Sequence, residues 1–223
     1  MFIRISYSMS GDDPVWPGNY KMAIEPYTEI SNGHVANQSI VTFLNHFGSH
    51  MDGPKHFNDK GPRLEEMPLD TFIYESPLLI ELPLTFGQLV TVEDLIPHAV
   101  NLQQADLLMI RSGFSSVRRD APDRYAAEGP GMSSEACRYL MDHCPKLKAI
   151  AMDWISLASY PHPDEGVLAH QVLLGMFHDR YICIIEDLNF DEIAEKKVHR
   201  VIALPLFIKN TDSAPVSVVA ECI

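Results

Sequence analysis

Residues 46–56 read His46-Phe47-Gly48-Ser49-His50-Met51-Asp52-Gly53-Pro54-Lys55-His56, and the rest of the chain is best interpreted outward from this stretch. It holds three of the ten histidines together with one carboxylate. Imidazole nitrogens and carboxylate oxygens are ligands that suit Zn²⁺, Mn²⁺ or Fe²⁺, so their density here indicates a metal site. The alternative is a histidine-rich loop exposed to solvent, because polar residues of this kind are common on protein surfaces.

The stretch is expected to be extended rather than helical. Two histidines four residues apart could share one face of a helix, but Gly48 and the Gly53-Pro54 pair are poor helix residues. In an extended chain alternate side chains share a face, so His50 and Asp52 can point at one spot. Gly48 lets the backbone bend and bring His46 to the same place. We therefore predict the end of a strand that runs into a turn.

Three polar residues far along the chain stand at predicted strand ends or helix starts, where α/β folds place ligand-binding groups. Glu186 follows the apolar run 182–185, and a carboxylate at the edge of a buried run needs a partner charge or a metal. Asp153 follows the apolar run 149–152 and could serve in the same way or cap a turn with its oxygen. His170 alone fits a core or helix-cap histidine better than a ligand.

Composition limits the class of protein. With 223 residues, 46% hydrophobic and 21% charged, the chain can bury a core and is expected to form a single domain over residues 1–223. A net charge of -13 disfavours nucleic acid as a partner. The four cysteines have neither zinc-ribbon spacing nor the density of a disulfide scaffold, which predicts reduced thiols and a cytoplasmic location. No apolar run approaches the roughly 20 residues of a membrane span, so no membrane partner is expected.

The order of the predicted elements indicates an α/β fold. Strands are predicted at residues 2–9, 20–30, 39–44, 78–82, 105–111, 148–153, 182–186, 201–208 and 216–222. Helices are predicted to begin at Thr91 and to cover residues 134–143, 169–174 and 191–196. Asn32-Gly33 is a strong signal for a two-residue hairpin turn between the second and third strands. Alternation of strands and helices from residue 78 onward favours a mixed sheet with flanking helices.

Residues 46–56 also resemble the His-x-Gly-Thr-His-x-Asp-x-Pro-x-His signature of the cyclase-like metal-dependent hydrolases, the family of bacterial kynurenine formamidase and isatin hydrolase. The resemblance extends over nearly the whole chain through five further segments, Trp16-Pro17-Gly18, Ala151-Met152-Asp153 with Ser156, His170-x-x-Leu173-Leu174, Ile185-Glu186-Asp187-Leu188 and Leu204-Pro205-Leu206. Two departures stand out. Ser49 replaces the usual Thr, and the connection between His170 and Glu186 is longer, which leaves open whether segment 175–181 relocates the second metal site.

The resemblance implies a swivelling β/β/α domain that assembles as a homodimer or homotetramer. It implies one or two divalent ions per chain, held by two ligand sets that share a carboxylate: His46, His50 and Asp52 for one ion, and Asp52, His170 and Glu186 for the other. It further implies that His56 is the proton donor and acceptor and that Trp16 lines the substrate pocket. Zinc is the expected metal and manganese the alternative.

The chemistry that such residues permit is hydrolysis. A divalent ion lowers the pKa of a bound water from 15.7 to about 7, so that a hydroxide is available to attack a carbonyl carbon near neutral pH. An amide nitrogen is a poor leaving group and needs a proton. Histidine suits that task because it titrates near neutral pH, and His56 lies past the Gly53-Pro54 turn, close to the metal ligands. Trp16 would stack on an aromatic substrate.

We therefore expect a metal-dependent hydrolase that cleaves a carbon–nitrogen bond in a small aromatic amide. An arylformamide such as N-formylkynurenine is the leading substrate, and a cyclic amide such as isatin is the next. Two other classes stay open. One is a metal-dependent lyase or dehydratase, which could use the same ion and histidine for elimination. The other is a non-catalytic metal- or ligand-binding protein on the same scaffold, in which His56 is a further ligand.

Overall fold

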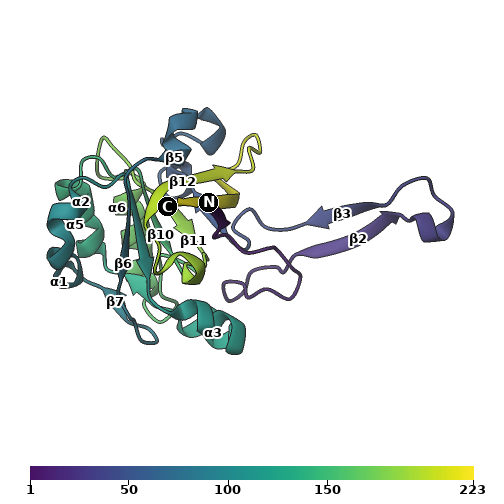
Figure 1. Cartoon of the computed structure of the whole chain (residues 1–223), viewed down its shortest axis with the longest axis horizontal. Coiled ribbons are helices and arrows are strands. Elements are labelled where there is room, and N and C mark those ends of the chain that lie inside the picture. Colours follow the sequence, from purple (N-terminus) through teal and green to yellow (C-terminus); the bar gives the residue numbers. More distant parts are fainter.

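The structure, a computed structural model, describes residues 1–223 and is organised around a nine-stranded mixed sheet (Figure 1). The sheet contains β1 (Phe2–Arg4), β4 (His50–Asp52), β5 (Ile73–Tyr74), β6 (Pro77–Glu81), β8 (Leu107–Arg111), β10 (Ala149–Met152), β11 (Cys183–Glu186), β12 (Val198–Pro205) and β13 (Ser213–Cys222). Their spatial order is β5-β12-β13-β4-β11-β10-β8-β6, and β1 pairs with β13. Strands β6, β8, β10 and β11 run parallel, whereas β4 is antiparallel to both of its neighbours.

Helices cover one face of the parallel strands. They are α1 (Val92–Leu95), α2 (Ala99–Leu102), α3 (Phe114–Asp120), α4 (Pro122–Glu128), α5 (Ser134–His143) and α6 (Pro163–Leu173). A small parallel pair, β7 (Leu89–Val90) and β9 (Gly131–Met132), lies beside them. The expected α/β fold with a mixed sheet and flanking helices is thus confirmed. None of these helices has the length and apolarity needed to cross a membrane.

Two apolar cores lie on the two faces of the sheet. One fills the space between the sheet and α5 and α6, and includes Leu140, Ile150 and Trp154. The other is enclosed by the sheet itself, which curls so far that β12 also contacts β6, and includes Met51, Ile185 and Val201. Burial of both faces explains why the parallel strands read as continuous apolar runs in the sequence.

Strand β4 lies between β11 and β13, at the place where the parallel strands meet the antiparallel ones. Met51 is completely buried in the core that the sheet encloses, so its neighbours His50 and Asp52 face the opposite side, toward α6. The chain then leaves the sheet at Gly53 and makes a 3-10 turn over Pro54–His56. The predicted strand end that runs into a turn is confirmed.

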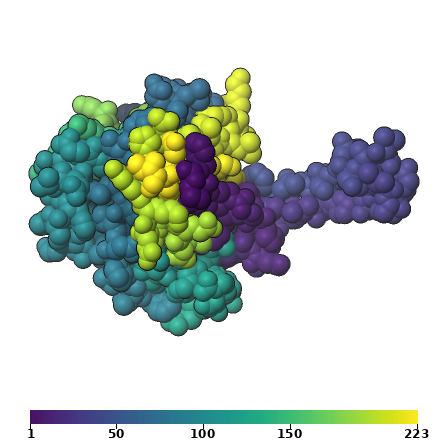
Figure 2. Space-filling model, viewed as in Figure 1, coloured from purple at the N-terminus to yellow at the C-terminus, as the bar shows by residue number.

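A long hairpin, β2 (Ala23–Thr28) with β3 (Gln38–Thr42), projects from the body of the molecule (Figures 1 and 2). The two predicted strands are present, but the predicted two-residue turn is wrong. Residues 29–37 connect the strands through a 3-10 turn over Ile30–Asn32, and Gly33 follows it with a φ of 87°. We call residues 20–44 the arm.

Most of the central elements were predicted and a few were not. The helix at residues 134–143 and the strands near residues 78, 107, 149 and 183 occur as expected. Helix α6 begins at Pro163 rather than at residue 169, because proline is well suited to the first turn of a helix. Residues 191–196 form only a 3-10 turn, and α3 and α4 were not predicted.

Candidate metal centre and its pocket

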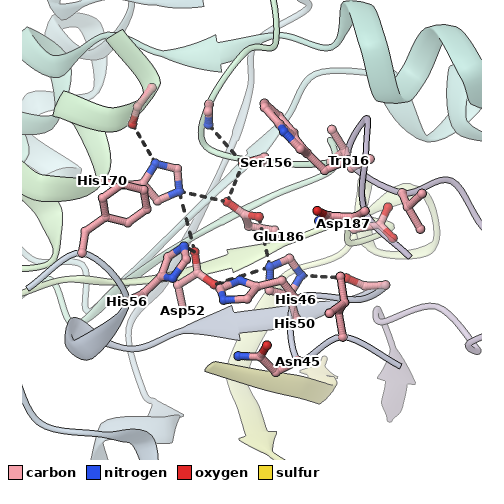
Figure 3. Close-up of a pocket in the computed structure, with 18 of the residues that line it drawn as sticks. Trp16, Asn45, His46, His50, Asp52, His56, Ser156, His170, Glu186 and Asp187 are labelled. Atoms are coloured by element: carbon pink, nitrogen blue, oxygen red, sulfur yellow. Dashed lines mark hydrogen bonds and ion pairs between the residues drawn. The ribbon is translucent and has the colours of Figure 1, made fainter. Parts of the chain in front are cut away.

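A cavity of about 450 Å³ opens over the end of β4 and β11 (Figure 3). Its lining includes every residue predicted for the site: Trp16, His46, His50, Asp52, His56, His170 and Glu186. These residues come from four separate parts of the chain, namely the loop before the arm, the 46–56 stretch, α6 and the end of β11. The fold therefore brings the whole predicted set to one place.

Register between β4 and β11 places the two central carboxylates. His50 is directly opposite Glu186, and Asp52 is opposite Ile184, so the three polar side chains share one face of the sheet. His50 Nε2 lies 3.2 Å from Glu186 Oε2 and 3.4 Å from Asp52 Oδ1. All three side chains are almost fully buried. A one-residue slip of β4 would turn His50 and Asp52 to the other face.

Gly48 brings the first histidine of the stretch to the same carboxylate. Its φ of 63° lies in the left-handed region, which glycine adopts without strain, and the chain bends there as expected. After this bend, His46 Nδ1 lies 2.9 Å from Asp52 Oδ1.

His170 approaches from α6 on the other side. Its Nε2 lies 3.7 Å from Asp52 Oδ2 and 3.7 Å from Glu186 Oε1. The longer segment 175–181 does not move either residue away from the pocket. Arg180 holds this segment against α5 by donating hydrogen bonds to three backbone carbonyl oxygens, those of Met141, Cys144 and Leu147.

Backbone carbonyl groups orient two of the imidazoles. His50 Nδ1 lies 2.8 Å from the oxygen of Gly48, and His170 Nδ1 lies 2.7 Å from the oxygen of Gly166. Carbonyl oxygens only accept, so both Nδ1 atoms carry the proton and both Nε2 atoms face the carboxylates with a free lone pair when the ring is neutral. This is the usual arrangement around metal-binding histidines.

The donor atoms fit a divalent cation. Asp52 Oδ1 is buried and has no hydrogen-bond partner, although two imidazole nitrogens lie within 3.4 Å of it. An orphaned buried carboxylate oxygen is costly, and a cation satisfies it. Ligand atoms about 2.1 Å from a shared tetrahedral ion lie roughly 3.4 Å apart, close to the spacing around Asp52 and Glu186.

Electrostatics point the same way. Burial would lower the pKa of His46, but the Asp52 carboxylate and a hydrogen bond with Asp212 raise it to about 9. Burial likewise opposes the charged form of His50, yet the neighbouring carboxylates of Asp52 and Glu186 hold its pKa well above the usual value. For Glu186, burial and Asp52 favour the neutral acid, but His170 and His50 lower its pKa to about 2. The carboxylates thus demand positive charge at this point.

Asp212, in the connection between β12 and β13, completes the site and was missed by the sequence reasoning. Its Oδ2 lies 2.9 Å from His46 Nε2 and 2.8 Å from His56 Nδ1, while Asn45 donates to its Oδ1 at 2.8 Å. Burial favours its neutral acid, but the hydrogen bonds of His46 and His56 hold its pKa well below the usual range. Asp212 lies in the turn between the last two predicted strands, where polar residues are common, and no local pattern marks it as a partner of the histidines.

His56 lies at the rim of the cluster. Its Nε2 is 3.9 Å from Asp52 Oδ2, and its side chain is 26% exposed, against 5% for that of His50. Distances alone allow a second grouping of ligands, in which His46, Asp52 and His56 hold one ion and His50, Asp52 and Glu186 hold another. The position of His56 at the rim thus fits a proton donor, and its distance from Asp52 also fits a ligand.

Asp153 caps a turn and is not part of the site. Its carboxylate accepts hydrogen bonds from the backbone N–H and hydroxyl of Ser112 and from the N–H of Gly113, and it does not line the pocket. Asp153 therefore caps the turn between β8 and α3.

Comparison with known proteins agrees with the resemblance carried by the sequence. The family model described as "Putative cyclase" matches residues 3–159. The chain belongs to the cyclase family. Among similar proteins, the kynurenine formamidase of Delftia acidovorans is 29% identical over 219 residues, which are 98% of this chain and 96% of that protein. An uncharacterized protein of Haemophilus influenzae is 35% identical over 125 residues, which are 56% of this chain and 88% of that protein.

Solved structures show the same cyclase fold. Isatin hydrolase A from Labrenzia aggregata superposes with a TM-score of 0.83 at 19% identity, covering 99% of this chain and 93% of that one. A structure described as a potential metal-dependent hydrolase with cyclase activity superposes with a TM-score of 0.75 at 22% identity, covering 99% and 96%.

The central position of Asp52 leads to a prediction about metal content. Asp52→Asn keeps the shape of the side chain but removes the charge that faces all four histidines, so the purified variant should contain less than a tenth of the metal of the unchanged protein. Elemental analysis measures this directly. Asp142→Asn, an exposed change on α5, is the control and should leave the metal content as it was. Equal metal content in the two variants would show that Asp52 is not a ligand.

Proposed function

We propose that this cyclase-family protein is a metal-dependent hydrolase that cleaves the carbon–nitrogen bond of a small aromatic amide. The observation that carries the proposal is the unpartnered oxygen of Asp52, buried at the floor of an open pocket and surrounded by imidazoles. A structural metal site is normally closed by protein ligands, whereas this cluster opens into a cavity large enough for a small molecule.

His46, His50, Asp52, His170 and Glu186 would hold one or two divalent ions, zinc first and manganese as the alternative. Such an ion supplies an activated water and polarises the carbonyl group. His50, Asp52, His170 and Glu186 lie on β4, α6 and β11, and elements of this kind keep a site more precise than loops do. His46 lies in the turn before β4.

His56 and Asp212 form a pair suited to proton transfer. Asp212 accepts a hydrogen bond from His56 Nδ1, which fixes the tautomer and turns Nε2 toward the pocket. In the proposed reaction water adds to the carbonyl carbon, the carbon–nitrogen bond breaks, and Nε2 passes the proton taken from the water to the departing nitrogen. The products are a carboxylate and an amine.

The pocket wall favours an aromatic substrate. Trp16 lines the cavity and also packs against the core on the helix side of the sheet. Its ring meets Tyr160 edge to face, with 5.6 Å between centroids, and Phe57 and Ile155 add further apolar surface to the lining. The names of the relatives agree, because both kynurenine and isatin are aromatic. We rank arylformamides first, since the kynurenine formamidase is similar over the full length, and cyclic amides such as isatin second.

A hydrolysis assay tests the proposed reaction. The purified protein, supplied separately with Zn²⁺ and Mn²⁺, should release formate from a formyl-anilide or N-formylkynurenine, and more slowly open the ring of isatin. Chelator should abolish both reactions. Loss of water from a hydroxylated ring, without any hydrolysis, would favour a lyase. Tight metal binding without turnover of any amide would favour the binding protein that the sequence left open.

His56 offers a way to separate catalyst from ligand. His56→Ala should keep its metal and its melting temperature but lose roughly 10²–10⁴-fold in kcat, the usual contribution of a positioned proton-transfer group. His50→Ala should lose metal and activity together, and its melting temperature should no longer respond to added metal. His199→Ala, an exposed histidine outside the pocket, is the control. Loss of metal from the His56 variant would make His56 a ligand.

We also propose that the chain works in a reducing cytoplasm, where its four buried free cysteines stay reduced.

We propose further that the chain forms a homodimer or homotetramer that is joined through the arm. Every residue of β2 and β3 is exposed or half-exposed, and the arm leaves Ile24 55%, Tyr27 66%, Ile40 51% and Val41 47% exposed. A two-stranded hairpin without a packing partner is marginal in water. No residue of β2 or β3 is buried against the rest of the chain, so we propose that a second copy of the chain packs on these strands.

The arm proposal predicts a change in mass. Light scattering should give at least twice the chain mass of 25.1 kDa for the unchanged protein. Ile24 and Val41 are cross-strand partners, and replacing both with Ser removes an apolar pair, so this variant should shift toward the single-chain mass. Val100→Ser, an exposed apolar residue on α2, should not. A single-chain mass for the unchanged protein would contradict the proposal.

A further inference from the structure

Arg118 joins three segments behind the pocket. It lies on α3 with only 10% of its side chain exposed. Its Nε and Nη2 donate to the two carboxylate oxygens of Asp187 at 2.7 and 2.9 Å, and its Nη1 donates to Asp13 at 3.3 Å. Its guanidinium group also lies over the ring of Tyr7, 3.8 Å from the centroid. Neither metal binding nor proton transfer, as proposed above, uses this residue.

Asp187 has an uncommon backbone conformation. It directly follows the candidate ligand Glu186 and has a φ of 56°, one of only two non-glycine residues with a positive φ. For a residue with a side chain this conformation is unfavourable, and it persists only where the surroundings hold it. Besides Arg118, Tyr125 donates a hydrogen bond to its carboxylate at 2.6 Å. Burial and the nearby Asp187 raise the pKa of Tyr125 well above its usual value, so it stays a donor.

The conformation of Asp187 is connected to Glu186 through the segment that follows β10. The N–H of Asp187 donates to the carbonyl oxygen of Trp154 at 2.9 Å. Three residues further on, the N–H of Leu157 donates to Glu186 Oε1 at 2.6 Å, and Ser156 adds its hydroxyl at 3.2 Å. A change at Asp187 therefore loosens the segment that fixes the carboxylate of Glu186.

The turn is also connected to the signature stretch. The hydroxyl of Ser49, which stands where the family signature has Thr, donates to the carbonyl oxygen of Asp187 and accepts from the N–H of Tyr7 at 2.9 Å. Arg118 stacks on that same Tyr7. Its contact with Asp13 reaches the loop whose next residues, Pro14, Val15 and Trp16, line the pocket.

We propose that Arg118 is a positioning residue that sets both the metal affinity of Glu186, through Asp187, and the placement of the Trp16 wall, through Asp13. The inference rests on the proposed function in assuming that Glu186 binds metal. A buried ion pair is by itself weak evidence of a role beyond folding. Here one guanidinium group contacts both Asp187, which follows the candidate ligand Glu186, and Asp13, in the loop that forms the pocket wall. An ion pair that served only folding would not need to join these two parts of the site.

Arg118→Lys is the variant that tests the proposal. Lysine keeps the positive charge, so Asp187 is not left unpaired, but it cannot form the two parallel hydrogen bonds of the guanidinium fork. The dissociation constant for Zn²⁺, measured by competition with a chromophoric chelator, should rise at least tenfold, the usual effect of losing a partner that orients a metal ligand. KM for the best substrate of the hydrolysis assay should also rise, because the Trp16 wall loses its anchor.

Arg111→Lys is the matched control. Arg111 also pairs with two carboxylates, Glu81 and Asp191, at the end of β8, but it does not line or support the pocket. This variant should lose less thermal stability than Arg118→Lys, because the ion pairs of Arg111 are more exposed, and it should show no change in metal affinity or KM. Tyr125→Phe, which removes one hydrogen bond to Asp187 and no charge, should weaken Zn²⁺ binding in the same direction by a smaller factor.

The outcomes are distinct. If Arg118→Lys melts lower but binds Zn²⁺ and substrate as the Arg111 variant does, Arg118 serves the fold alone and the proposal is wrong. If Arg118→Lys fails to fold, the Tyr125→Phe titration decides, and unchanged Zn²⁺ affinity in that variant overturns the proposal. If the unchanged protein binds neither Zn²⁺ nor Mn²⁺ in the same titration, the proposed function itself fails, and this inference fails with it.

Discussion

The buried carboxylate of Asp52 is the constraint on which the rest of this site depends. Burying a carboxylate costs several kcal/mol unless it is paired with positive charge and hydrogen bonds. Its two oxygens face imidazole nitrogens of His46, His50, His56 and His170, and Oδ1 has no hydrogen bond. Four nitrogen donors around one charged group leave a place for a cation. The lowered pKa of Glu186 and the raised pKa of His46 likewise show that this position favours positive charge.

Topology makes this concentration of polar groups tolerable. Strand β4 is antiparallel between β11 and β13, so residues more than 130 positions apart in the chain, such as His50 and Glu186, become direct neighbours. The apolar face of the same strands fills the core enclosed by the sheet. His50, Asp52, His170 and Glu186 thus emerge from a strand or a helix, and the free energy of burying Met51 and Ile185 holds the register that keeps the candidate ligands together.

A second layer of charge surrounds the first. Asp212 contacts His46 and His56, and Asp187 is held by Arg118 in a conformation that few residues adopt. These contacts fix tautomers and directions that metal binding and proton transfer require. The arm differs from the site, because the residues of β2 and β3 are exposed and are not held by buried contacts within the chain.

The local pattern of the sequence was enough to predict the extended 46–56 stretch, helix α5 and the buried strands, because glycine, proline and apolar periodicity act over a few residues. The role of His170 as a ligand came only from the family resemblance. The local pattern could not show that Asp212 reaches His56 or that Arg118 reaches Asp187, since both contacts join segments at least 69 positions apart. It also left Asp153 ambiguous and missed α3 and α4, whose apolar stripe is weak. Only the tertiary structure decided these points, because strand register and helix packing, not local propensity, determine which distant side chains meet.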